Sequence, residues 1–458
     1  MYIHEQRFDI PVAPGHRNLL AHLERELKAR AGDEAPIRAV VSATTDTQYE
    51  CEIGLVGGLS PRRREALPSM FRFRRRRMEN TEGFTTVFLV PTGIGSTIGG
   101  HAGDATPAAA LLASVSDTLI THPNVVNASD IIDLPHNALY VEGSIITRFM
   151  MGAIGLEPVR DNRVLVVIDS QHGSQFESAA INSVNAARST YGLDAPRIVM
   201  LDPPVSVRAE YAASGRAIGR VDQIEGLLEV LDQARGDYDA VALATVVGVP
   251  FEYHLSYFKS HGEMVNPWGG AEAIFTHALS TMYNVPVAHA PMLESKAVDD
   301  IDPGVVDPRM AAEAISTAFF MCVLKGLQRS PRVFGIEEAV AAPPPEALTV
   351  EDVSALVIPD KVVGLPTLAA LEQGIPVIAV RENENILHND LRALPWAEGQ
   401  LHVVENYWEA AGVVAALRAG LDPATMRRPI ATAATELHAN PAQAGVMLER
   451  AISEAGRS

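Results

Sequence analysis

The chain has little cysteine, no long apolar run and a shortage of positive charge. Its two cysteines, Cys51 and Cys322, do not form a CxxC pair of the kind found in zinc or redox sites. No segment approaches the roughly eighteen consecutive apolar residues of a membrane span, and the N-terminus lacks the apolar core of a signal peptide. We therefore expect a cytoplasmic protein in a reducing compartment, with no membrane contact.

Acidic residues outnumber basic ones, 56 against 37, which gives a formal net charge of −19. A surface of this sign repels phosphate backbones, so nucleic acid is not an expected partner. A small molecule is the expected substrate. The sequence also allows the protein to form a homo-oligomer. One basic run departs from this background, with eight arginines between Arg62 and Arg77. It either binds an anion or pairs with acidic residues of the same chain or of a second subunit.

Short β-branched runs alternate with Ala-rich helical stretches from residue 84 onward. Continuous apolar strands between helices are typical of mostly parallel sheets that are covered on both faces. The sequence therefore predicts a doubly wound α/β fold with two Rossmann-like domains and an N-terminal α+β extension. The runs that carry this prediction are 85–90, 164–168, 197–201, 240–247, 285–290, 355–358 and 376–380.

Three segments follow from the same pattern. Residues 1–83 form the N-terminal α+β segment, with a helix expected at 18–30 and a strand at 37–42. Residues 84–341 form the main α/β domain. Consecutive prolines in 342–352 exclude helix and sheet, so we place a linker there and a smaller C-terminal α/β unit over 342–458.

The strongest local signal is the glycine-rich segment Pro91–Asp104, which follows directly after an apolar run. Such a turn presents free N–H groups to an anion, and Asp104 or Thr106 is expected to cap the next helix. No Gly-Lys-Ser/Thr follows, and the spacing does not match GxGxxG, so ATP and NAD are not supported. The alternative is a structural turn that needs several positive φ angles. The glycines are Gly93, Gly95, Gly99, Gly100 and Gly103.

Polar residues follow several other predicted strands, where ligands collect in this architecture. They include an Asp and a His three positions apart, Asp169 and His172, and a second glycine turn before a helix. If these side chains converge, they could bind a divalent metal ion, although no compact ligand spacing such as HExxH is present. Cys322, in an apolar helix pattern, is kept as a minor nucleophile. The remaining residues of this group are His122, Asn124, Asn127, Glu142, Asn266, Gly269, Gly270, Glu272 and His289.

Several of these segments together resemble the family of domains of unknown function numbered 3326. They are 91–105, 119–127, 137–143 and 148–160, with 268–277, 287–291 and 322–331 further on. The resemblance implies no known activity. It departs where His101 stands in place of an expected aromatic residue and where 359–364 lacks an expected cysteine, and His172 lies outside the shared motif. The shared motif positions are Gly93, Gly95, Gly100, Asp104, His122, Asn124, Asn127, Glu142 and His289.

These observations predict an enzyme that acts on a small anionic metabolite, bearing phosphate or carboxylate, at the glycine-rich loop. Histidine-assisted acid/base hydrolase, lyase or transferase chemistry all fit. One alternative is a glycosyltransferase, because 355–385 resembles the nucleotide-sugar half of those enzymes, with Gly364 facing the donor. The other is a non-catalytic metabolite-binding protein. The predicted catalytic residues are His122, His289, Asp104, Asp169 and Glu142; the predicted substrate-binding residues are Thr92, Gly93, Gly95, Gly99, Gly100, Asn124, Asn127, Asn266, Gly269, Gly270 and Glu272.

Overall fold

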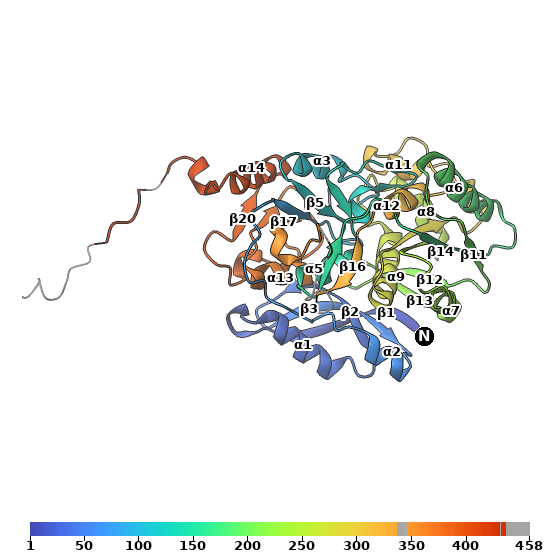
Figure 1. Cartoon of the computed structure of the whole chain (residues 1–458), viewed down its shortest axis with the longest axis horizontal. Helices are drawn as coiled ribbons and strands as arrows, with labels where there is room; N and C mark the ends of the chain where they lie inside the picture. The colour runs from blue at the N-terminus through green and yellow to red at the C-terminus, as the bar shows by residue number, and fades with distance from the viewer. Residues whose placement is uncertain (337–343, 345, 431, 437–458) are drawn as a thin grey trace, which may run out of the picture.

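The computed structural model describes residues 1–336, 344, 346–430 and 432–436, so part of the linker predicted over 342–352 lies outside the described residues. The chain has a mixed α/β fold built on two large sheets, one of six strands and one of ten (Figure 1). Both sheets contribute loops to the same central region.

The six-stranded sheet is parallel throughout. Its order is β20-β19-β17-β4-β5-β8, so the chain enters in the middle at β4 and builds outward in both directions. The loop after β4 therefore lies where the strand order reverses. The strands are β4 (Thr85–Phe88), β5 (Thr118–Thr121), β8 (Ala138–Tyr140), β17 (Val353–Pro359), β19 (Val377–Val380) and β20 (Leu401–Val404).

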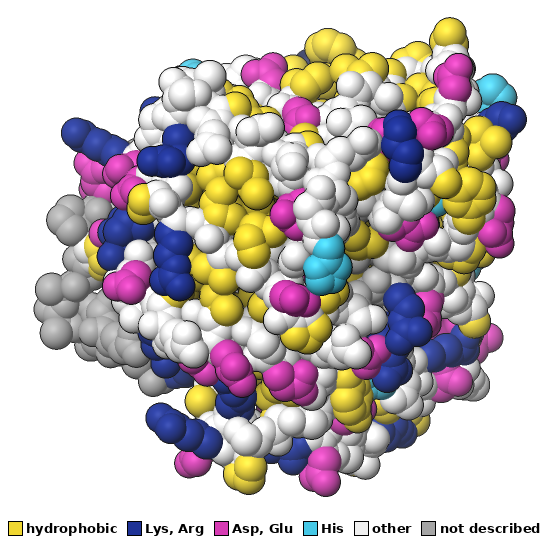
Figure 2. Space-filling view, turned by 90° about the vertical axis from the view of Figure 1, so that its right-hand side faces the viewer, with side chains coloured by type: hydrophobic (Ala, Val, Ile, Leu, Met, Phe, Trp, Pro, Cys, Tyr) yellow, Lys and Arg dark blue, Asp and Glu magenta, His cyan; other side chains and the backbone are white. Residues whose placement is uncertain are grey.

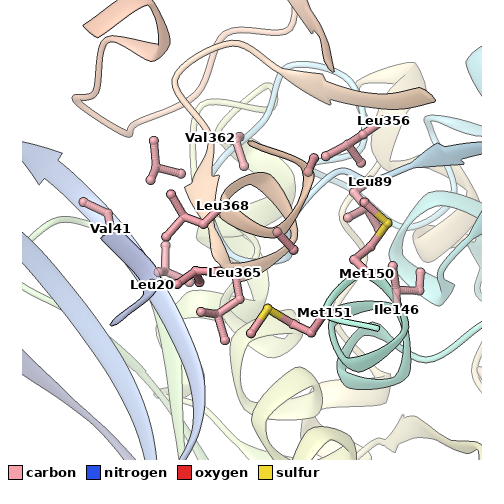
Figure 3. Packing of buried hydrophobic residues seen from close by; sticks show 14 of the residues in the cluster. Leu20, Val41, Leu89, Ile146, Met150, Met151, Leu356, Val362, Leu365 and Leu368 are labelled. Atoms are coloured by element: carbon pink, nitrogen blue, oxygen red, sulfur yellow. The ribbon is translucent and has the colours of Figure 1, made fainter. Parts of the chain in front are cut away.

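Helices cover both faces of this sheet. On one face α3 (Thr106–Ser114) packs beside α14 (Tyr407–Arg418), and on the other α5 (Gly143–Met150) packs beside α13 (Leu365–Gln373) (Figure 1). Neighbouring residues of β17 alternate between the two cores, Leu356 facing one and Val357 the other, as strand geometry requires. Figure 3 shows the core on the α5 and α13 side, to which Leu356, Leu368 and Met150 all belong; Met150 lies beside Leu89.

The ten-stranded sheet is mixed. Its order is β11-β10-β14-β12-β13-β1-β3-β2-β18, and β15 also pairs with β14. Strands β11, β10, β14 and β15 are parallel, and the part from β12 to β18 is antiparallel. The strands are β1 (Tyr2–Pro11), β2 (Ala35–Thr44), β3 (Gln48–Gly57), β10 (Val164–Asp169), β11 (Ile198–Leu201), β12 (Ser206–Tyr211), β13 (Ala217–Asp222), β14 (Ala240–Gly248), β15 (Val287–Met292) and β18 (Val363–Gly364).

One long helix, α9 (Pro267–Tyr283), is the hub of the molecule. It packs against β13, β15, β12 and β2 of the ten-stranded sheet and against α5 of the other layer. Twelve of its seventeen residues are buried, among them Ala271, Ile274 and Phe275. The remaining helices include α1 (Leu19–Arg30), α2 (Pro61–Ala66), α6 (Gln175–Tyr191), α7 (Glu225–Gln233), α8 (Phe251–Lys259) and α12 (Met321–Gln328), with short turns α4 (Pro123–Val126), α10 (Lys296–Asp299) and α11 (Ala311–Ala314).

All seven apolar runs predicted as strands form strands, and the predicted N-terminal helix and strand are α1 and β2. The prediction of mainly parallel sheets holds for the six-stranded sheet, but the ten-stranded sheet is mixed because β1, β3, β12 and β13 add antiparallel pairs. The three predicted segments share sheets: β17 pairs with β4, and β1 pairs with β13. The division into three domains stays a prediction.

The predicted cap of α3 was wrong. Ala105 occupies the N-cap without a side-chain hydrogen bond. Asp104 turns back into the glycine-rich loop instead, where its Oδ1 accepts from the amides of Gly99, at 2.8 Å, and His101, at 3.3 Å. The loop is therefore closed on itself before the helix begins.

Several arginines of the run pair within their own chain. Arg63 contacts Asp232, and Arg64 contacts Asp33 at 3.0 Å. Arg76 donates to the carbonyl oxygens of Val353, at 2.8 Å, and Gln373, at 3.0 Å. Figure 2 shows basic and acidic side chains interspersed on the side of the molecule at the right of Figure 1.

Candidate functional site

A cavity of about 140 Å³ lies between the glycine-rich loop, the start of α5, the exposed side of α9 and the strand β15. The first two elements follow strands of the parallel sheet, and the last two belong to the layer of the ten-stranded sheet. The site is therefore formed where the two sheets meet, as expected for residues that follow parallel strands.

Most of the predicted site residues line this cavity. Asp104, Asp169, Gly95, Gly99 and Gly270 do not. The predicted residues that line it are Thr92, Gly93, Gly100, His122, Asn124, Asn127, Glu142, Asn266, Gly269, Glu272 and His289.

The buried carboxylate Glu142 forms an ion pair with a histidine that sequence reasoning missed, His277. Glu142 Oε1 lies 2.5 Å from His277 Nδ1. Its Oε2 accepts from the amides of Ser144, at 2.9 Å, and Ile145, at 3.1 Å, because Glu142 caps the N-terminus of α5. Burial opposes ionisation, but His277 and the Ser144 hydrogen bonds outweigh it and lower the pKa of Glu142 to about 2. Glu142 therefore holds a negative charge beside His277.

The His277 ring can lie beside Glu142 only because the next residue, Gly143, has no side chain. A Cβ on Gly143, the residue after Glu142, would lie 2.7 Å from Cε1 of the His277 ring. The side chain of His277 is 16% exposed, against 3% for Glu142. Both residues line the cavity, and His277 is the more accessible member of the pair.

The second histidine–carboxylate pair has the opposite arrangement. His289 Nδ1 lies 3.2 Å from Glu272 Oε2, and its Nε2 lies 2.7 Å from the hydroxyl of Thr245 on the neighbouring strand β14. Both ring nitrogens are therefore engaged within the chain. The side chain of His289 is fully buried, whereas that of Glu272 is 24% exposed. In this pair the carboxylate is the more accessible group.

His122 lies at the end of β5 and supports the glycine-rich loop. Its Nε2 accepts from the backbone amide of Val90 at 3.1 Å. Burial, with the nearby His277, lowers the pKa of His122 to about 4, so the ring is neutral at neutral pH. Because Nε2 accepts a hydrogen bond, the proton of the neutral ring is on Nδ1. His122 is consequently a hydrogen-bond donor rather than a base.

The two asparagines after β5 have different partners. Asn124 Nδ2 donates to the carbonyl oxygens of Val90, at 3.0 Å, and Gly99, at 2.7 Å, and so fastens the glycine-rich loop. Asn127 Nδ2 donates to the hydroxyl of Tyr140 at 2.9 Å, while its Oδ1 is buried without a partner among the described residues. Asn127 therefore offers the cavity an acceptor.

The glycines of the loop allow close packing against neighbouring backbone as well as access of a ligand to the loop amides. A Cβ on Gly93 would lie 2.5 Å from the carbonyl oxygen of Ala217, and one on Gly100 would lie 2.1 Å from that of Ser96. Gly93 also needs its positive φ of 79°, as the structural-turn alternative required. Nothing described accepts a hydrogen bond from the amides of Gly93 and Gly100, both of which line the cavity.

Three predicted titratable residues lie away from the cavity. Asp104 is occupied by the loop amides, and burial raises its pKa to about 7. Asp169 Oδ1 accepts from the amide of Val205 at 3.2 Å, and burial likewise raises its pKa to about 7. His172 is exposed at the surface. Across the described ranges, no group of three or more His, Cys, Asp or Glu side chains is placed to hold a metal ion.

A family profile matches residues 85–427, under the description "Protein of unknown function (DUF3326)". The chain belongs to this family. The match confirms the resemblance seen in the motifs and contains every residue of the cavity described above. The N-terminal strands β1, β2 and β3 precede the matched segment.

A relative of this DUF3326 protein is a Synechococcus protein that carries the name "Uncharacterized lipoprotein". The two are 37% identical over 345 residues, which cover 75% of this chain and 93% of the relative. No solved structure matches the chain. None of the helices in the described part has both the length and the apolar character to cross a bilayer.

Two further hollows adjoin the central cavity of this DUF3326 member. One of about 110 Å³ shares Thr92, His122 and His277 with it and is also lined by Arg38 and the start of α13. The other, of about 220 Å³, shares Asn127, Glu272 and His289 with it. The three cavities are therefore neighbours that share part of their walls.

The site residues that sequence reasoning missed are His277, Glu313 and Arg38. His277 stands on the side of α9 that also carries Gly269 and Ala273, at helical spacing, and that polar interruption of an apolar helix was the available signal. Glu313 accepts from the amide of Ala102, and burial raises its pKa to about 7. No local pattern marks Glu313 or Arg38, because each reaches the site from a distant segment.

Proposed function

We propose that the protein is an enzyme that carries out acid/base chemistry on a small anionic metabolite in the central cavity. The observation that carries this proposal is the presence of two histidine–carboxylate pairs, from separate elements, on one cavity. A histidine oriented by a carboxylate is a general arrangement for moving protons. Two such pairs allow one group to remove a proton while the other supplies one.

In this proposal His277 and Glu272 are the groups that meet the substrate. The Nδ1 atom of His277 lies beside the carboxylate of Glu142, and we propose that its Nε2 atom transfers the proton. Glu272 is the exposed member of its own pair. His289 and Glu142 are positioning residues that fix the ring and the carboxylate.

The anionic part of the substrate is proposed to bind against the loop. The free amides of Gly93 and Gly100 line the cavity, and so does the neutral His122, which donates through Nδ1. Arg38 supports this wall from behind, since it donates to the carbonyl oxygen of Thr92 at 3.2 Å and pairs with Glu5. Hydrolase, lyase and transferase reactions remain compatible with these groups.

The sheet order agrees with this placement. We propose that the six-stranded sheet is a Rossmann-like doubly wound unit, because its parallel strands build outward from β4 and β17 to the two edges. Ligands in such folds bind at the carboxyl ends of the strands, at the point of reversal. Thr92 and Gly93 follow β4 at that point.

The test is consumption of metabolites by the purified protein. A mixture of small carboxylates and phosphate esters is incubated with the wild-type chain, and loss and gain of species are followed by mass spectrometry. His277→Gln and Glu272→Gln should each abolish the conversion. His136→Gln, a matched change at an exposed histidine outside the cavity, should leave it intact. Conversion unchanged in the His277→Gln/Glu272→Gln double variant would contradict the assignment.

Non-catalytic metabolite binding is the second candidate. It is favoured because His289, Asn124 and Asn266 form hydrogen bonds within the protein, which makes these side chains less available for chemistry. A ligand that is bound tightly and recovered unchanged would support it. The glycosyltransferase alternative has less support, since the hollow beside Gly364 is only about 110 Å³ and a nucleotide sugar needs a larger site. Thermal-shift measurements with nucleotide sugars would detect such a donor.

The cellular location is also a proposal. The sequence favours the cytoplasm, whereas the name of the Synechococcus relative raises attachment to a membrane through a lipid. Fractionation of cells that express the full chain, with and without detergent, separates the two. Release into the soluble fraction without detergent would support the cytoplasmic location.

A further inference from the structure

A hollow of about 220 Å³ beside the central cavity extends beyond the groups that the proposed chemistry uses. It begins at Glu272 and His289 and extends between α8, α12 and the end of β15. Beyond those two residues its wall is mainly apolar, and much of it is aromatic or branched. The apolar side chains are Phe258, Trp268, Met292, Leu293, Val298, Ile301, Phe319 and Val323.

The segment between β15 and α12 covers this hollow and is fastened at several points. Asp130 Oδ1 accepts from the amides of Phe320, at 2.9 Å, and Met321, at 3.0 Å. Glu313 ties the cover to the glycine-rich loop through the amide of Ala102, at 2.6 Å. The segment that covers the hollow is thus fixed to the rest of the fold at Glu313 and at the start of α12.

Three buried polar atoms on this wall have no hydrogen-bond partner among the described residues: the hydroxyl of Ser129, Oδ1 of Asn127 and Nε2 of His254, which lies 3.6 Å from Oε1 of Glu294. Ser129 is 5% exposed. Buried polar atoms are rarely left unpaired, and water or a ligand commonly satisfies them. Ser129 and Asn127 both lie on the hollow, Asn127 at its junction with the central cavity. They provide a polar point at one end of an apolar space.

From this geometry we propose that the substrate of the site is amphipathic. Its anionic end binds at the glycine-rich loop, and an apolar group, a short alkyl chain or a ring, fills the hollow beyond Glu272 and His289. This inference names the substrate class and rests on the proposed function. The apolar wall recognises the tail by excluding water, and Asn127 and Ser129 bond to a polar atom or water near its base.

Binding of straight-chain carboxylates from acetate to octanoate, measured by titration calorimetry, tests the proposal. Each methylene that enters an apolar pocket should tighten binding about fourfold until the hollow is full. Ala314→Phe places a large side chain on the wall and should remove this dependence on chain length. Ala312→Phe makes the same change in the same short helix at a position outside the lining and should preserve it.

The outcomes separate the two proposals. Equal affinity for short and long carboxylates, or equal chain-length dependence in Ala314→Phe and Ala312→Phe at matched thermal midpoints, would overturn the amphipathic substrate. His277→Gln should retain the chain-length dependence, since it alters chemistry rather than the hollow. Chain-length-dependent binding without conversion of any metabolite would support the amphipathic ligand and contradict the proposal that the protein is an enzyme.

Discussion

The charge on Glu142 is the most consequential electrostatic feature of the site, and Glu142→Gln removes it with little change of shape. The substituted amide side chain keeps an oxygen that can accept from the amides of Ser144 and Ile145, so the cap of α5 is largely preserved. What the variant loses is the ion pair with His277. The substitution therefore measures how much the ionised carboxylate contributes to the fold.

The pKa of Glu142 gives the expected size and sign. Its value falls from 4.5 to about 2 on folding. A depressed carboxyl pKa stabilises the folded state above the unfolded-state value, and the stabilisation is lost as pH falls through the folded-state value. At about 1.4 kcal/mol per unit, Glu142 contributes about 3 kcal/mol at pH 7. Less than half of this should remain at pH 3, and little at pH 2.

Urea unfolding of wild-type and Glu142→Gln protein, followed by tryptophan fluorescence between pH 7 and pH 3, measures this difference. Taking the difference between the two proteins cancels the titration of carboxyl groups elsewhere. We expect the variant to be about 3 kcal/mol less stable at pH 7, with the gap narrowing below pH 4.5. A gap below about 1 kcal/mol at pH 7, or one that is constant with pH, would refute the ion pair as the source of the charge.

Three further predictions concern stability. Asp169→Asn should stabilise the fold by about 4 kcal/mol at pH 8, because burial raises the Asp169 pKa from 3.8 to about 7. In urea titrations this stabilisation should vanish toward pH 4. A stabilisation that does not change with pH would contradict the prediction. Gly100→Ala should lower the thermal midpoint, since its Cβ would meet the Ser96 carbonyl oxygen at 2.1 Å. Gly412→Ala, in open space on α14, should raise the thermal midpoint. Similar shifts in the two variants would contradict the packing argument. Arg76→Ala should cost about 2 kcal/mol or more by leaving buried carbonyls unpaired, while Arg75→Ala, an exposed neighbour, should change stability by about 0.5 kcal/mol or less.

The parallel strands were predictable because they are buried on both faces and so form uninterrupted apolar runs. β17 reads VSALVIP, and all seven residues are buried. The antiparallel strands carry no such signal. β12 reads SVRAEY, with only Val207 buried. β1 alternates irregularly because Ile3 on one face packs into one core, whereas Phe8 and Ile10 on the other face pack into another. The pairing of β1 with β13 joins segments about 200 residues apart, which no local pattern specifies.

The site was predictable to the extent that its residues follow strands of a parallel sheet. His122 and Glu142 follow β5 and β8, neighbours in the sheet, so their proximity follows from topology. Asp169 satisfies the same rule but follows β10, whose end lies at a different part of the mixed sheet. The rule identifies strand ends without saying which sheets meet. That information lies in the packing of α9, which brings Glu272 and His277 to the strands of the other layer.

The glycine-rich loop illustrates why composition alone overstated its binding surface. Its amides at Gly99, His101 and Ala102 are already occupied by the carboxylates of Asp104 and Glu313. These acids fill the place that an external anion would take at a helix N-terminus. Only the two ends of the loop that line the cavity, at Thr92–Gly93 and at Gly100, remain for a ligand. The loop therefore forms mainly a wall of the cavity, and the two groups that we propose to move protons, Glu272 and His277, lie on α9.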